Sequence, residues 1–257
     1  MSQAESRRGQ APCQLFLAVR RQELVLDGGV AGQALSVHAP LAGITAPTGG
    51  DRAAMDGAVA REALQSLLRT EGLPRHATLH VVFEQPCLLH MTVPWSPQLL
   101  KADQAGSYVR RCAVESGWDL GRWQLQVDDA GFGQPRLAIA YPVAWLEALQ
   151  AFTKAQGWQM GRVTGLSVLA WQEARRQSKA VRQLVLAGGQ APLFLAGDSR
   201  LESVHALSAP QAAREEDLLR LWQRLRWRQP AWTDGEPVLH GLHAENPEPA
   251  DQPSEPA

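Results

Sequence analysis

Few side chains in this sequence have the types and spacing that a catalytic site requires. His240 and His243 could be imagined as metal ligands, but in a strand a spacing of three puts them on opposite faces. The adjacent carboxylates of Asp128 and Asp129 precede Gly131, a pattern typical of a solvated hairpin turn. The chain has neither a Walker A sequence nor a G-x-S-x-G nucleophile motif. The residues therefore predict no catalytic group and no metal site.

The cysteines and the hydropathy of the sequence indicate the cellular compartment of the protein. Cys13, Cys87 and Cys112 are an odd number at unrelated spacings, without a C-x-x-C pair, which is typical of free thiols in a reducing cytoplasm. The sequence contains no run of roughly 18 apolar residues, so it predicts no transmembrane helix. The polar residues 1–12 are unlike a secretory signal.

Composition excludes several classes of protein. The 257 residues include 25 Lys plus Arg and 26 Asp plus Glu, and 45% are hydrophobic, so the chain is globular and is no polycation built to coat nucleic acid. One segment near the end mixes tryptophan with arginine, at Trp222, Arg224, Arg226 and Trp227. Such a mixture can stack on single-stranded nucleic acid, but the near-zero net charge argues against that partner. Two readings stay open: an amphipathic helix on its own sheet, or a protein-docking face.

Turn residues and hydrophobic periodicity show one order of elements twice. Three short antiparallel strands, a helix and a strand are predicted over residues 14–83, and the same order recurs over residues 183–242. Between them lie a helix from 96 or 97 to 116, two strands, a helix, a strand, and a helix that Ser167 is predicted to cap. This order predicts an α/β protein with mixed sheets.

The pattern also predicts where the parts of the chain begin and end. The predicted regions are a flexible N-terminus (1–12), a first lobe (13–93), an inserted α/β subdomain with connecting helices (94–180), a second lobe (181–245) and a disordered, acidic, Pro-rich tail (246–257).

The middle of the chain resembles a known family. The run Leu88-Leu89-His90-Met91-Thr92-Val93-Pro94-Trp95-Ser96-Pro97, a helix through Tyr108, a hairpin over 123–140 and the helix near Ser167 are similar to the pilus assembly protein PilM, the MSHA-type pilus protein MshI and the cytoplasmic domain of the type II secretion protein GspL. The resemblance covers roughly residues 14–243. It implies a degenerate actin-like (RNase H-like) fold, made of two βββαβ lobes with an inserted α/β subdomain.

An active actin-like ATPase needs acids or hydroxyls in the turn after the first strand of each lobe, where Mg²⁺ and phosphate bind. The first turn here carries Arg20 and Arg21 and no Asp or Gly; the second carries Gly188 and Gly189 and no acid. The nucleotide site is therefore expected to be degenerate, with no cofactor, and ATP is disfavoured. The alternative is an actin-fold ATPase or kinase with divergent phosphate loops.

The resemblance implies a non-catalytic scaffold of a bacterial type IV pilus or type II secretion assembly platform. Such a protein would be cytoplasmic and peripheral to the inner membrane, and it would reach the membrane only through a partner. The implied partners are an inner-membrane platform protein and the secretion or pilus ATPase, and a homodimer stays open. The predicted partner-binding residues are Val93, Trp95, Trp222, Arg226 and Trp227.

Overall fold

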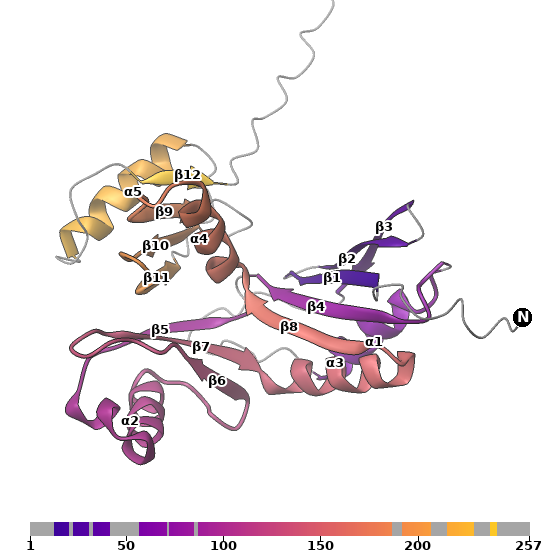
Figure 1. Cartoon of the computed structure of the whole chain (residues 1–257), viewed down its shortest axis with the longest axis horizontal. Helices are drawn as coiled ribbons and strands as arrows, with labels where there is room; N and C mark the ends of the chain where they lie inside the picture. Colours follow the sequence, from indigo (N-terminus) through magenta and orange to yellow (C-terminus); the bar gives the residue numbers. More distant parts are fainter. Residues whose placement is uncertain are drawn as a thin grey trace, which may run out of the picture.

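The structure is a computed structural model, and it describes residues 13–20, 23–30, 33–41, 57–70, 72–84, 87–186, 192–206, 215–228 and 237–240. Its strands form three sheets (Figure 1). No helix in these ranges combines the length and the apolar character needed to cross a membrane. The predicted flexible N-terminus and acidic tail lie outside the described residues.

The first sheet has five strands in the order β3-β2-β1-β4-β8. β1 is antiparallel to β2, β2 is antiparallel to β3, and β4 and β8 run parallel to β1. The predicted order of three antiparallel strands, a helix and a strand is confirmed. The elements of this lobe are β1 (Cys13–Val19), β2 (Glu23–Val30), β3 (Gln33–Pro40), α1 (Gly57–Leu67), β4 (Ala77–Phe83), α3 (Val143–Gln156) and β8 (Gln159–Gly165).

One face of this sheet is covered by α1 and α3, which also pack against each other (Figure 1). β4 alternates buried and half-buried side chains, as a strand with one covered face must. Phe83 at its end is fully buried and makes edge contacts with the rings of Tyr141 and Trp145. The aromatic cluster joins the end of the first sheet to the start of α3.

The second sheet has four strands in the order β11-β10-β9-β12. Its order of three antiparallel strands, a helix and a parallel strand repeats that of the first lobe, as predicted. Every residue of β9 and β10 is buried, because α4 covers one face of the sheet and α5 the other. The elements are α4 (Leu166–Gln177), β9 (Gln183–Leu186), β10 (Leu193–Ala196), β11 (Ser203–Ala206), α5 (Glu215–Arg228) and β12 (Val238–His240).

The third sheet is antiparallel, in the order β5-β7-β6, with α2 (Ala102–Glu115) packed on one of its faces (Figure 1). Its strands are β5 (Leu89–Val93), β6 (Trp123–Val127) and β7 (Arg136–Pro142). The predicted boundary at residue 94 placed 89–93 with the first lobe, but β5 pairs with β7. A turn closed by the Cys87 N–H and the Glu84 carbonyl separates β5 from β4.

Two helix starts differ from the prediction. The helix expected from 96 or 97 to 116 is interrupted at Lys101: Pro97–Leu100 is a 3₁₀ turn capped by Ser96, and α2 begins at Ala102. α4 is capped by Gly165 and not by Ser167, because β8 passes directly into the helix without a loop. The Ser167 hydroxyl instead lies 2.9 Å from Nε2 of His90, which links α4 to the third sheet.

Candidate functional site

Arg20, in the first predicted phosphate turn, is held by two carboxylates. Its Nη1 donates to Glu23 at 2.9 Å and its Nε donates to Glu84 at 3.0 Å. These hydrogen bonds raise the pKa of Arg20, and Glu23 is also 3.1 Å from Nδ1 of His38. Two acids therefore already neutralise the guanidinium that a phosphate would have to bind. Arg21, Gly188 and Gly189 lie outside the described residues.

The predicted partner-binding residues do not form one surface. Val93 is fully buried beneath α2, and Trp222 is buried on the second sheet, where its indole N–H donates to Oε1 of Gln183 at 2.7 Å. These two side chains belong to cores, so neither offers a surface to a partner. Trp95 is half-buried against the ring of Phe132, which is 77% exposed. The side chains of Arg226 and Trp227 lie outside the description.

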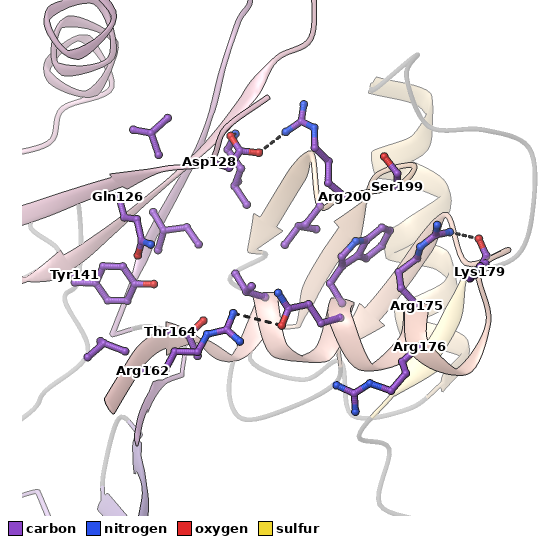
Figure 2. A pocket seen from close by; sticks show the side chains of 18 residues that line it. Gln126, Asp128, Tyr141, Arg162, Thr164, Arg175, Arg176, Lys179, Ser199 and Arg200 are labelled. Atoms are coloured by element: carbon purple, nitrogen blue, oxygen red, sulfur yellow. Dashed lines mark hydrogen bonds and ion pairs between the residues drawn. The ribbon is translucent and has the colours of Figure 1, made fainter. Parts of the chain in front are cut away.

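The structure instead contains a groove of about 650 Å³ between the third sheet and α4, a volume typical of ligand sites. Figure 2 shows Gln126 and Tyr141 from the third sheet on one side, with Arg162 of β8 and Arg175 of α4 across from them. Leu137, Ile139 and Tyr141 reach this groove from the face of the sheet opposite α2. The apolar lining consists of Val127, Leu137, Ile139, Val163, Val168, Trp171 and Leu201.

Positive charge dominates the polar lining of the groove. Its cations are Arg162, Arg175, Arg176, Lys179 and Arg200, and its one acid is Asp128. Arg200 is paired with Asp128, and Arg176 is paired with Glu173. Arg162 donates to the amide of Gln172 at 3.4 Å, and Arg175 donates to the carbonyl oxygens of Lys179 and Val181. Among the described residues, Arg162, Arg175 and Lys179 therefore have no carboxylate within ion-pair distance.

The ion pair between Asp128 and Arg200 closes one side of the groove (Figure 2). Arg200 lies between β10 and β11 and also donates to the Pro135 carbonyl, whereas Asp128 accepts from the Leu137 N–H at 2.7 Å. Burial raises the pKa of the Asp128 carboxyl, although Arg200 and the Leu137 N–H oppose the shift. We call this contact between the second lobe and the third sheet the Asp128–Arg200 clasp. The prediction of a solvated turn is wrong for the Asp128 side chain, which is partly buried and paired with Arg200.

Tyr141 marks the opposite side of the groove. Burial raises the pKa of its phenol, and nearby Arg162, the Gly165 backbone and the Thr164 side chain oppose the shift. The ring of this third-sheet residue therefore lies beside the junction of β8 and α4. Within the described residues, no group of three or more His, Cys, Asp or Glu side chains is arranged to hold a metal ion.

Sequence reasoning missed the groove because its cations come from separate segments. In the sequence, Arg175 and Arg176 stand at the carboxyl end of a predicted helix, where cations are ordinary. The density of positive charge over residues 175–182 was the available signal. Without the pairing of the sheets, nothing in the sequence places Arg162 and Arg200 beside it.

No family model and no curated protein matches the sequence. Among solved structures, the chain is similar to the cytoplasmic domain of EpsL, an inner-membrane component of the type II secretion system of Vibrio cholerae. The identity is 15%, over 88% of this chain and 80% of that one, with a TM-score of 0.50. A Bacteroides thetaiotaomicron protein of unknown function, with an actin-like ATPase fold, is 8% identical over 93% of this chain and 84% of that one, with a TM-score of 0.57.

A third similar structure is the PilM-PilN type IV pilus biogenesis complex, 15% identical over 83% of this chain and 70% of that one, with a TM-score of 0.47. The first two similarities confirm the expected actin-like fold.

Proposed function

We propose that this chain is a non-catalytic scaffold of a bacterial type II secretion or type IV pilus assembly platform. It acts in the cytoplasm at the inner membrane, where it binds the cytoplasmic segment of a membrane partner. The observation that carries the proposal is the groove between the third sheet and α4. It combines an apolar lining with three cations, Arg162, Arg175 and Lys179, that have no carboxylate within ion-pair distance in the described part of the chain. The assembly ATPase is a further proposed partner, and a second copy of the chain is another.

The fold supports this proposal. The cytoplasmic domain of EpsL, which belongs to an inner-membrane component of a secretion system, has the same fold over most of both chains. Arg20 is bound to Glu23 and Glu84, so the first phosphate turn presents no free cation at this position. A scaffold needs only a binding surface, and the groove supplies one without a nucleotide.

Pairwise binding tests the scaffold. The full-length chain is mixed with the cytoplasmic segment of each pilus or secretion platform protein encoded in the same genome, and binding is measured by calorimetry. We expect one segment to bind, and an Arg162→Glu variant to weaken it more than the control Arg110→Glu on α2. Failure of every platform segment to bind would contradict the assignment to a platform.

A second titration, with Mg-ATP, tests the absence of catalysis. We expect no saturable binding with turnover. Micromolar binding accompanied by hydrolysis or phosphoryl transfer would instead support the alternative, an actin-fold ATPase or kinase with divergent phosphate loops.

A further inference from the structure

The two walls of the groove differ in chemistry. The third sheet presents Leu137 and Ile139, both buried. The wall across from them carries Arg162 from β8 and Arg175 from α4, with Lys179 just beyond the helix, beside the apolar side chains of Val168 and Trp171. A ligand that fills the groove therefore meets apolar groups on both sides and these three cations on one side alone.

The cations on this wall are available to a ligand. Arg162 is bound to an amide and Arg175 to two carbonyl groups, so neither is paired with a carboxylate in the described part of the chain. Lys179 is exposed. Carboxylates bind such cations with charge-assisted hydrogen bonds, which are stronger than bonds between neutral groups.

The backbone around the groove suits an extended chain. Residues from β6 and β8 line it, and these are the terminal strands of the third and first sheets in the described part of the chain. Terminal strands have unpaired backbone groups to which an added strand can bond. An extended segment also turns successive side chains to opposite sides, which matches two walls of different character.

We infer that the occupant of the groove is an extended protein segment in which acidic residues alternate with apolar ones. The acidic side chains face Arg162, Arg175 and Lys179, and the apolar side chains cover Leu137 and Ile139. This inference rests on the proposed function for the identity of the partner. A flat anionic membrane is disfavoured, because it would leave the apolar lining of the groove uncovered.

Fluorescence anisotropy on the full-length chain tests the chemistry of the ligand. The probes are short labelled peptides that alternate Glu with Leu, Gln with Leu, or Lys with Leu. We expect the Glu peptide to bind most tightly and its affinity to fall as salt is added. Equal binding of the Glu and Gln peptides would overturn the role of charge, and tighter binding of the Lys peptide would overturn the inference altogether.

A double variant tests the place of binding. Arg162→Gln with Lys179→Gln is expected to weaken the Glu peptide by about 10-fold, since each removed partner of a partly exposed charge contributes a modest amount. Arg61→Gln with Arg110→Gln removes two exposed arginines from α1 and α2 and serves as the matched control. An equal loss in both double variants would place the peptide elsewhere on the surface.

Vesicles distinguish a lipid ligand from a peptide. A membrane ligand predicts three results together: stronger binding to anionic than to neutral vesicles, loss of that binding in Arg162→Gln with Lys179→Gln, and no binding of the Glu peptide. This combination would overturn the inference.

The proposed function and the inference about the ligand can also fail separately. A platform segment that binds equally to wild type and to this double variant contradicts the inference alone, whereas a Glu peptide that binds in the groove while no platform segment binds contradicts the assembly role alone.

Discussion

Arg20 and Arg162 belong to the same five-stranded sheet, yet their surroundings differ. Arg20 follows β1 and is bound to the carboxylates of Glu23 and Glu84, whereas the guanidinium of Arg162 in β8 donates to the amide of Gln172. The first charge is neutralised within the lobe, and the second has no carboxylate within ion-pair distance among the described residues. An arginine in a sequence therefore indicates an anion site only when its own neighbours leave the charge unpaired.

The largest effect is expected at Gly197, in the turn that carries Arg200 to the groove. A Cβ at this position would lie 1.9 Å from the Arg200 carbonyl oxygen. The backbone of the turn must therefore change its conformation in the Gly197→Ala variant. We expect the free energy of unfolding, measured with urea, to fall by about 3 kcal/mol. The control Gly106→Ala, in α2, meets no atom within 4 Å and should stabilise by up to about 1 kcal/mol. Similar losses in both variants would show that the turn is not constrained.

The next effect concerns binding. Arg162→Glu should weaken the alternating Glu-Leu peptide by about 10-fold, equivalent to about 1.4 kcal/mol. Arg20→Glu should change the affinity by less than about 2-fold, because this side chain is outside the groove lining. Anisotropy titrations at one salt concentration measure both. A larger effect from Arg20→Glu would reverse the comparison between the two arginines.

A smaller effect is expected on stability. Arg20→Gln removes two partly exposed ion pairs and should lower the free energy of unfolding by up to about 1 kcal/mol. Arg162→Gln removes no ion pair seen in the described structure and should change it by less than about 0.5 kcal/mol. Chemical denaturation of both variants beside wild type gives the two values. A larger loss of stability in Arg162→Gln than in Arg20→Gln would contradict the difference in ion pairing between the two arginines.

The smallest effect is a pH dependence of opposite sign at two acids. His38 and then Arg20 hold the pKa of Glu23 below its ordinary value, so its contribution to stability is lost as pH falls through the folded pKa. Burial raises the pKa of Asp128, so its contribution is greatest below the unfolded pKa and is lost as pH rises through the folded one.

Thermal unfolding across mildly acidic pH measures this effect. As pH falls, wild type should lose its advantage over Glu23→Gln, and should gain relative to Asp128→Asn. The same sign for both acids would contradict the different surroundings described for them.

Much of the fold could be predicted because local signals determine it. Turn glycines, alternation as in β4 and helical periodicity as in α5 mark each element where it stands in the sequence. The sheet to which a strand belongs depends on pairing between distant residues. For this reason the sequence predicts Val93 in the first lobe, although its strand pairs with β7.

The candidate site was less predictable, for the same reason. Trp222 and Val93 have types that suit a docking face, but types alone do not distinguish a surface from a core. In the sequence, neither the type nor the spacing of Arg162 and Arg200 distinguishes them from other arginines. They line one groove only because the third sheet lies beside both α4 and the turn between β10 and β11.

The junction of β8 and α4 has a mechanical consequence. In the described part of the chain, the first sheet passes to the second lobe at one covalent crossing, where β8 ends at Gly165 and α4 begins at Leu166. A crossing without a loop has no slack, and a Cβ on Gly165 would lie only 2.7 Å from Cδ1 of Leu88. A force on α4 would therefore act directly on the end of β8, which runs parallel to β4 and β1 in the first sheet. The Asp128–Arg200 clasp, in contrast, joins the second lobe to the third sheet through a non-covalent contact.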